Sequence, residues 1–248
     1  MGFKIPAEFI EKLRHAQKVT ISTGAGTSAE SGVPTFREAQ TGLWALYDPE
    51  QLATPHAFRK NPRLVWDWYA WRRSLVTNAE PNAGHLALAQ MAGLIPELVL
   101  ITQNIDGLHQ RAGNTDVIEL HGNIMRSKCS HCMRIALEFE ETEDPPPTCP
   151  NCRGLLRPDV VWFGESLPYE SLVAARKAAR DCDIFFSIGT SSLVQPAASL
   201  PLEALDRGNV VVEINPAQTP LSSLMTYVLS GSSGFVLPEL VKATWPDC

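Results

Sequence analysis

Four of the six cysteines in this chain form two close pairs, spaced C-x2-C-x16-C-x2-C, at Cys129, Cys132, Cys149 and Cys152. Two thiolates three residues apart on a tight turn can occupy two corners of a tetrahedron, and a second pair can supply the other two. We therefore expect one structural zinc ion, because four protein sulfurs leave no corner open for water or substrate. Two redox pairs are the alternative, although two matched knuckles favour zinc. Cys182 and Cys248 belong to no motif.

The composition narrows the class of protein. The chain has 248 residues, 44% of them hydrophobic, and a net charge of −6. This fits one large globular domain, or one domain with an inserted module, and argues against nucleic-acid binding as the main function. The first residues lack the apolar run of a signal peptide, and no apolar stretch is long enough to span a bilayer. We expect a cytoplasmic monomer without nucleic-acid or membrane partners.

Short apolar runs alternate with helical patterns along most of the chain. Five runs predict strands, at residues 18–23, 98–102, 117–120, 183–188 and 210–214. Several are continuously apolar, which is typical of strands that are covered on both faces. The helical patterns lie at residues 83–92, 169–180 and 197–207. This order predicts an α/β fold with a Rossmann-like, doubly wound parallel sheet.

Two segments interrupt the alternation. Residues 38–80 carry two helix starts, Thr54-Pro55 and Asn61-Pro62, each a capping residue before a proline, and predict a helical insert. Residues 127–156 hold the paired cysteines and a proline-rich loop, and predict a small zinc-ribbon module. The remainder would form the Rossmann-like domain, from residues 1–37, 81–126 and 157–248.

A glycine-rich loop follows the first predicted strand. Gly24, Gly26 and Ala29 fit the pattern G-x-G-x-x-G/A, in which the backbone approaches a pyrophosphate at the start of a following helix. A glycine turn that serves packing alone is the alternative. A dehydrogenase would next place an acidic residue at the end of a second strand, but Asp48 lies in a turn. The sequence thus predicts a dinucleotide without hydride transfer.

Polar clusters stand at the carboxyl ends of four later strands, where open α/β sheets bind ligands. They are Gln103-Asn104-Ile105-Asp106, His121-Gly122, Gly189-Thr190-Ser191 and Asn215-Pro216-Ala217. Any one of them could be a structural turn, but four at successive strand ends favour a binding site. His121 is the natural acid or base candidate, because imidazole titrates near neutral pH.

Several longer motifs resemble one enzyme family. GAGTSAESGVPTFR, TQNIDGLHQRAG, ELHG, VVWFGE, GTSSLVQP and EINPA, together with the cysteine pairs, resemble the sirtuins, which are NAD-dependent protein-lysine deacylases. The motifs keep the order of the family and cover the chain from Lys18 to about Leu237. The segment containing Tyr69 and Arg72 is similar to the Tyr-x-x-Arg element of class III members, including bacterial and archaeal ones, which prefer succinyl and malonyl groups.

The resemblance implies the chemistry and the residues that perform it. NAD and an acyl-lysine protein would react to give lysine, nicotinamide and 2′-O-acyl-ADP-ribose, with His121 as general base and Asn104 as a second catalytic residue. The cofactor would be bound by Gly24, Ala25, Gly26, Ser28, Phe36, Arg37, Gln103, Asn104, Ile105, Asp106, Gly189, Thr190, Ser191, Asn215, Pro216, Ala217 and Ser233. An extended substrate peptide would be clamped by Val161, Phe163, Gly164, Glu165 and Val194.

Tyr69 and Arg72 would share one helix face, where a phenol and a guanidinium can receive an acyl carboxylate. An exposed aromatic and basic helix is the plainer alternative. We expect desuccinylation or demalonylation alongside deacetylation.

Two other functions stay open at this point. NAD-dependent ADP-ribosyl transfer to protein would use the same cleavage of nicotinamide. A non-catalytic NAD-sensing module is less consistent with His121, because a pure binder needs no base.

Overall fold

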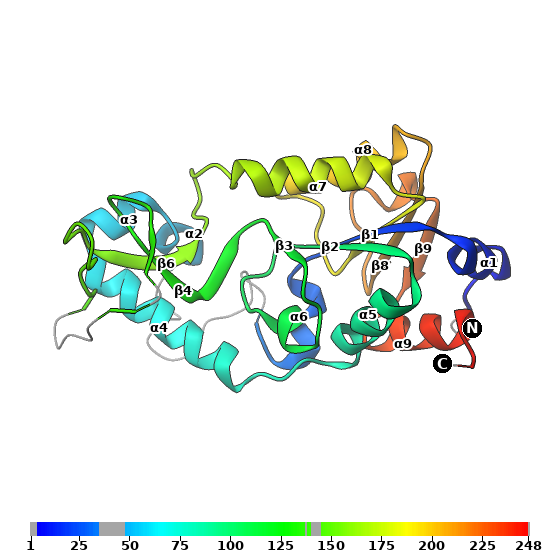
Figure 1. The fold of residues 1–248 in the computed structure, drawn as a ribbon, viewed down its shortest axis with the longest axis horizontal. Helices are drawn as coiled ribbons and strands as arrows, with labels where there is room; N and C mark the ends of the chain where they lie inside the picture. The colour runs from blue at the N-terminus through cyan, green and yellow to red at the C-terminus, as the bar shows by residue number, and fades with distance from the viewer. Residues whose placement is uncertain (1–3, 35–47, 137, 140–144, 248) are drawn as a thin grey trace.

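The computed structural model describes residues 4–34, 48–136, 138–139 and 145–247. Within them, the largest element is a parallel sheet of six strands (Figure 1). In spatial order these are β3 (Val117–Glu119), β2 (Glu97–Thr102), β1 (Lys18–Thr23), β7 (Ile184–Ile188), β8 (Val210–Asn215) and β9 (Tyr227–Ser230). The five predicted strands and the parallel topology are confirmed, and β9 adds an edge strand that the sequence patterns did not indicate.

The order of the strands reverses between β1 and β7. The chain proceeds from β1 outward through β2 and β3, and later returns to the other side of β1 for β7, β8 and β9. In this register Thr23 lies beside both Thr102 and Ile188, so three strands end at the same level. A crevice for ligands forms outside the carboxyl ends of strands at such a switch point.

Helices cover both faces of the sheet (Figure 1). One face carries α1 (Ala7–His15), α5 (Ala83–Leu94), α6 (Leu108–Arg111) and α9 (Ser233–Thr244), and the other carries α7 (Tyr169–Asp181) and α8 (Leu200–Leu205). Phe185 and Phe186 are consecutive, fully buried residues of β7 that belong to the two different cores. Two covered faces explain why this strand is continuously apolar.

A smaller unit lies at the far end of the molecule from the two termini (Figure 1). It contains an antiparallel sheet of β5 (Ile135–Ala136), β4 (Gly122–Cys129) and β6 (Leu156–Val160), and the helices α2 (Pro49–Leu52), α3 (Pro55–Lys60) and α4 (Pro62–Asn78). The two predicted helix starts are confirmed, because Thr54 and Asn61 accept hydrogen bonds from the backbone N–H groups of Ala57 and Leu64. Helix α4 packs on β4 and β6 through a core that includes Val65, Trp68 and Trp162.

The prediction of a helix after the glycine loop is wrong. The chain instead forms two 3₁₀ turns, η1 (Ala25–Thr27) and η2 (Ala29–Ser31), and then Gly32 takes a left-handed conformation with φ +77°. Such a residue ends a turn and does not propagate a helix. Any pyrophosphate at residues 24–34 would therefore meet the backbone of short turns and not the start of an α-helix.

The helix predicted at residues 197–207 is shorter than expected. It divides into η4 (Ala197–Ser199) and α8, and Pro201 stands in the first turn of α8, where its missing N–H costs no hydrogen bond. A further turn, η5 (Ser222–Leu224), precedes β9. No helix in the described part of the chain is both long and apolar enough to cross a bilayer.

Candidate active site at the switch point

The glycine loop touches the end of β7. The Gly26 N–H donates to the Gly189 carbonyl at 2.8 Å, and the Gly24 N–H donates to the Ile188 carbonyl at 2.9 Å. A Cβ atom on either Gly24 or Gly26 would lie 2.8 Å from the Gly189 oxygen. Glycine is therefore required for packing here, and the same contact joins the glycine loop to the third predicted cluster, Gly189-Thr190-Ser191.

The first predicted cluster, which contains Asn104 and Asp106, joins them through buried hydrogen bonds. Ser28 donates to an Asp106 carboxylate oxygen at 2.7 Å and accepts from the Asn104 side-chain amide at 3.0 Å. That amide also donates to the Gly24 carbonyl at 3.1 Å. All three polar side chains are buried, so their mutual hydrogen bonds fix their positions. The loop between β1 and η2 is thereby tied to the loop after β2.

Two histidines that the motifs did not single out lie behind this network. His85 Nε2 is 3.5 Å from Ser28 Oγ, and His109 Nε2 is 2.9 Å from the Thr23 hydroxyl. Their rings are 4.8 Å apart between centroids. Burial lowers the pKa of both, and that of His109 falls to about 3. Both are therefore neutral hydrogen-bonding groups. A signal for His85 exists in the sequence, because it is the third residue of a helix capped by Asn82.

His121 stands where β3 gives way to β4, and its Nδ1 atom lies 2.8 Å from the Gln103 carbonyl oxygen. A carbonyl only accepts, so Nδ1 carries the proton and Nε2 is left with a free lone pair. Burial lowers the pKa of His121 below its ordinary value, which favours the neutral ring. The geometry therefore suits a general base acting through Nε2.

The third and fourth clusters meet at Thr190. The Gln103 side-chain amide donates to its hydroxyl at 3.4 Å, and the Asn215 amide donates to its carbonyl at 2.9 Å. Ser233, at the start of α9, is buried and lies 3.5 Å from the Thr27 carbonyl. Ser191, Pro216 and Ala217 are exposed, whereas Ala25, Ile105 and Gly189 are half-buried. Phe36 and Arg37 lie outside the described residues.

The segment predicted to bind the peptide, residues 161–165, runs directly past His121. The expected strand is wrong here, because β6 ends at Val160 and the chain continues as a loop and a turn. The Val161 N–H donates to the His121 carbonyl at 2.9 Å, and the Phe163 N–H donates to the Ala53 carbonyl at 2.9 Å. The side chains of Phe163 and Val194 are exposed by 43% and 38%. Gly164 is exposed as well.

Glu165 differs from the other residues of this segment, because its carboxylate is bound within the protein. It accepts from both Nη atoms of the buried Arg157, at 2.5 and 2.9 Å. It also accepts from the Trp162 N–H at 2.8 Å. The pKa of Glu165 is lowered because these hydrogen bonds and the Arg157 charge outweigh desolvation. Its side chain is therefore committed to the protein.

Tyr69 and Arg72 both lie on α4, and Tyr69 contacts the loop after β6. Tyr69 is 1% exposed, and its hydroxyl accepts a hydrogen bond from Trp162 Nε1 at 2.9 Å. Burial raises the pKa of Tyr69 to about 12, although the charge of Arg72 acts in the opposite direction. Arg72 is half-buried, with its guanidinium 5.1 Å from the centre of the Trp68 ring. The plainer interpretation of an exposed helix is wrong for Tyr69.

The four cysteines converge at the tip of the small sheet. Their sulfur atoms all lie within 4.8 Å of one another, close to the separation of about 3.8 Å that tetrahedral zinc–thiolate bonds of 2.3 Å impose. The backbone N–H groups of His131 and Cys132 point at the Cys129 sulfur, at 3.3 and 3.4 Å. Such donors stabilise thiolates, so the residues present fit a structural zinc ion.

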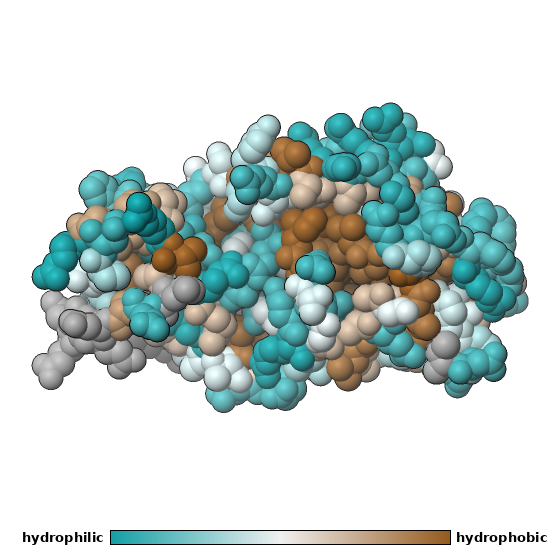
Figure 2. Space-filling view, in the orientation of Figure 1, coloured by the Kyte–Doolittle hydropathy of each residue, from teal (hydrophilic) through white to brown (hydrophobic). Residues whose placement is uncertain are grey.

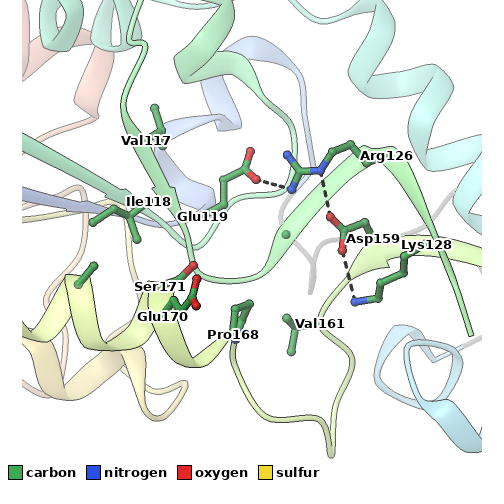
Figure 3. A pocket seen from close by; sticks show the side chains of 12 residues that line it. Val117, Ile118, Glu119, Arg126, Lys128, Asp159, Val161, Pro168, Glu170 and Ser171 are labelled. Carbon is green, nitrogen blue, oxygen red and sulfur yellow. Dashed lines mark hydrogen bonds and ion pairs between the residues drawn. The ribbon is translucent and has the colours of Figure 1, made fainter. Parts of the chain in front are cut away.

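A cavity of about 450 Å³ opens beside the site, between β3, the small sheet and the start of α7 (Figure 3). Four of its five charged lining residues form ion pairs: Arg126 with Glu119 and Asp159, and Lys128 with Asp159. Above β2 and β3, apolar side chains gather below α7 (Figure 2). The residues that line the cavity include Gly122 and Val161 but none of the glycine loop. It is therefore separate from the expected dinucleotide site.

Comparison with known proteins identifies one family. The model of the Sir2 family matches residues 24–196. An NAD-dependent protein deacylase of Methylococcus capsulatus is 48% identical over 244 residues, which cover 95% of this chain and 96% of that protein. NAD-dependent protein deacylase 1 of Pseudomonas aeruginosa is also 48% identical, over 96% of this chain and 98% of its own length.

Solved structures agree with the sequence relatives. A Sir2 homologue in complex with NAD superposes with a TM-score of 0.89 at 45% identity, over 98% of this chain and 95% of the other. A mutant homologue with 2′-O-acetyl-ADP-ribose gives 0.89 at 46% identity, over 97% and 96%. A complex of Sir2 with a p53 peptide and NAD gives 0.81 at 30% identity, over 96% and 98%.

Proposed function

This chain belongs to the Sir2 family, and on that basis we propose that it is an NAD-dependent protein-lysine deacylase. It transfers the acyl group of a modified lysine to ADP-ribose and releases nicotinamide and 2′-O-acyl-ADP-ribose. The observation that carries the proposal is the placement of His121. Its lowered pKa favours the neutral ring, and the hydrogen bond at Nδ1 leaves the lone pair on Nε2. His121 also contacts both the loop after β2 and the proposed peptide-binding segment at residues 161–165.

The carbonyl oxygen of the acyl-lysine would bond to the anomeric carbon of NAD as the bond from that carbon to nicotinamide breaks. Gln103, Asn104 and Asp106 surround that end of the cofactor, with Ile105 beside them. The hydrogen bonds of Asn104 and Asp106 to Ser28 hold these side chains before any ligand arrives. Such preorganisation lowers the cost of arranging polar groups during the reaction.

His121 then accepts a proton from a ribose hydroxyl at Nε2, while Nδ1 keeps its hydrogen bond to Gln103. That proton transfer makes the hydroxyl oxygen nucleophilic toward the acyl carbon. Asn104 acts beside it as the second catalytic residue. The pyrophosphate lies against Gly24, Ala25, Gly26 and Ser28, with Phe36 and Arg37. The adenosine half occupies the ends of β7 and β8, with Gly189, Thr190, Ser191, Asn215, Pro216, Ala217 and Ser233.

The substrate peptide binds as an added strand beside residues 161–165. Val161 and Phe163 contribute backbone carbonyls and not their N–H groups, which already bond to His121 and Ala53. Phe163 and Gly164 add exposed area, with Val194 on the opposite side. We propose that Glu165 only holds residues 161–165 in place, because its carboxylate is already bound by Arg157.

The acyl group is read by Tyr69 and Arg72. A guanidinium next to a neutral phenol offers a carboxylate several donors, whereas an acetyl group presents no charge to them. We therefore propose that the enzyme removes succinyl and malonyl groups in addition to acetyl groups. The high pKa of Tyr69 keeps its proton in place at physiological pH, so the phenol remains a donor.

One assay tests both the deacylase activity and the preference for acidic acyl groups. Peptides carrying acetyl, malonyl or succinyl lysine are incubated with NAD, and the products are identified by mass spectrometry. Arg72→Met should lower kcat/KM for the succinyl peptide at least tenfold more than for the acetyl peptide. Arg73→Met is the matched control on the same helix, because Arg73 donates to the Ile124 carbonyl and stacks on Trp66. Equal losses on both peptides in Arg72→Met would remove the carboxylate receptor from the proposal.

ADP-ribosyl transfer to protein would leave a different product in the same assay. A protein that gains ADP-ribose would favour transfer, and O-acyl-ADP-ribose favours deacylation. A non-catalytic NAD-sensing module would consume no NAD in the presence of acyl-peptide.

We also propose how the chain is organised. We propose a monomer in the cytoplasm, with the NAD-binding domain at residues 1–37, 81–126 and 157–248, the insert at 38–80 and the zinc module at 127–156. Its protein substrates carry acyl-lysine, and it has no nucleic-acid or membrane partner. Light scattering of the purified chain tests the monomer.

A further inference from the structure

A hydrogen bond between Trp162 and Tyr69 connects two proposed parts of the site: the peptide-binding segment at residues 161–165 and the acyl receptor of Tyr69 and Arg72. Trp162 Nε1 lies 2.9 Å from the Tyr69 hydroxyl oxygen, and both side chains are buried. One residue comes from the loop after β6 and the other from the middle of α4. The hydrogen bond therefore joins two segments that the proposed function uses for two different parts of the substrate.

The position of the Trp162 indole is fixed from several sides. The guanidinium of Arg157 lies 3.2 Å from the centre of the indole ring. Glu165 binds that guanidinium through both carboxylate oxygens and also accepts from the backbone N–H of Trp162. The ring of Phe58 packs 5.4 Å away. A bidentate pair that also bonds the tryptophan backbone leaves the indole little freedom to turn.

This arrangement determines what the Tyr69 hydroxyl can do. An indole nitrogen donates and never accepts, so the Tyr69 oxygen must be the acceptor in this hydrogen bond. The phenolic hydrogen must then point elsewhere. Arg72, one turn further along α4, offers only donors, so the hydrogen requires an acceptor that comes from outside the described residues. A hydroxyl that accepts a hydrogen bond also becomes a better donor.

We propose that Trp162 is a positioning residue for selectivity toward acidic acyl groups. Its N–H occupies the acceptor side of the Tyr69 hydroxyl and so directs the phenolic hydrogen to the acyl carboxylate beside Arg72. An acetyl group has no such oxygen to receive the hydrogen. The effect therefore lies in the ratio between acyl groups, and it rests on the proposed receptor of Tyr69 and Arg72.

Replacing Trp162 with 3-benzothienylalanine tests the role of the N–H alone. This residue keeps a fused ring of nearly the same shape but has sulfur in place of N–H. The ratio of kcat/KM for succinyl to acetyl peptide should fall about tenfold, the size expected for one hydrogen bond to a charged partner. The loss should come mainly from a higher KM for the succinyl peptide, because the contact forms when substrate binds. Trp162→Phe should lower the ratio in the same direction.

Two further variants make the outcome decisive. Trp66→Phe removes an indole N–H from α4, the helix that also carries Tyr69. Trp66 packs with the cysteines, so this variant should leave the succinyl-to-acetyl ratio of kcat/KM unchanged. Arg72→Met reports on the receptor itself. An unchanged ratio in the benzothienylalanine protein, with a lowered ratio in Arg72→Met, would overturn the role of Trp162 and keep the receptor. Equal losses on both peptides in Arg72→Met would overturn both.

Discussion

The Nδ1 atom of His121 lies 2.8 Å from the carbonyl oxygen of Gln103. This one contact sets the tautomer of the ring, because the carbonyl can only accept. It also ties the histidine to the loop that the cofactor would occupy, since Gln103 immediately follows β2. The proposed proton acceptor and the loop proposed to surround NAD are therefore held together by this contact.

The pH dependence of activity should reflect this environment. Burial lowers the pKa of His121 below its ordinary value of 6.5, so the ring stays neutral, and able to accept a proton, in mildly acidic solution. The acidic limb of kcat/KM should therefore lie below pH 6.5, measured as O-acyl-ADP-ribose formation from pH 5 to 9. His121→Asn, which can keep a hydrogen bond to Gln103, should lower kcat by about 10²–10⁴. An acidic limb at or above pH 6.5 would contradict the assignment.

The packing of the glycine loop predicts a large effect at Gly189. This residue has φ +60°, and an added Cβ would lie 2.4 Å from the Thr27 nitrogen. Gly189→Ala should lower the free energy of unfolding by about 3 kcal/mol or more and weaken NAD binding, since strain and a backbone clash add. Gly208→Ala is the control, because Gly208 has φ +79° with no atom within 4 Å of the new Cβ. It should cost about 1 kcal/mol in urea unfolding, and equal costs would refute the close approach.

Zinc should stabilise the small sheet. Cys129 and Cys149 are buried, and both pack in one core with Trp66 and Leu156. Chelation should therefore release about one zinc ion per chain, expose the amides of β4 and β6 to hydrogen exchange, and alter the fluorescence of Trp66. Cys149→Ser should lower zinc content in the same way. Cys182→Ser, at a buried cysteine outside the cluster, should leave zinc content unchanged; a loss there would argue against the four-cysteine site.

The ion pair of Arg157 and Glu165 should matter far more than pairs at the surface. The Arg157 side chain is 4% exposed, so Arg157→Met leaves Glu165 without the partner that offsets its desolvation. We expect a cost of about 3 kcal/mol in the free energy of unfolding. Arg180→Met breaks a pair with Glu203 in which the arginine is 46% exposed, and it should cost less than about 1 kcal/mol. Similar costs in urea titrations would contradict this difference.

Much of the fold could be predicted from local patterns. The strand at residues 18–23 has the predicted bounds, and the starts of α3 and α4 lie where a capping residue precedes a proline. These elements are specified by nearby residues. The strand β9 was missed because Tyr227–Ser230 is only four residues long and half exposed at the sheet edge, so its apolar run is too short to stand out. The helix expected after Gly26 is replaced by two 3₁₀ turns, which end at Gly32 in a left-handed conformation.

Parts of the candidate site could likewise be predicted from the sequence, and other parts could not. The clusters at strand ends could be predicted to converge, because parallel strands end at one edge of the sheet. The inward turn of Glu165 could not, since it depends on Arg157 reaching across a tight loop. The contact of Trp162 with Tyr69 likewise joins segments whose proximity exists only after folding.

Buried histidines should make the protein sensitive to acid. Burial lowers the pKa of His109 from an ordinary 6.5 to about 3, so between these values the unfolded chain binds more protons than the folded chain. The free energy of unfolding therefore falls as the pH drops below 6.5. His109 should account for about 2 kcal/mol of the loss between pH 7 and pH 5.

Urea unfolding at the two pH values measures that loss. His109→Gln cannot take up the proton but can still donate to the Thr23 hydroxyl, so it should lose less stability than the wild-type protein over the same interval. Part of the decrease should remain, because burial also lowers the pKa of His85 and His121. His15→Gln changes an exposed histidine on α1 and should show the full decrease of the wild-type protein. If His109→Gln lost as much stability as His15→Gln, the buried ring would not be the source of the acid sensitivity.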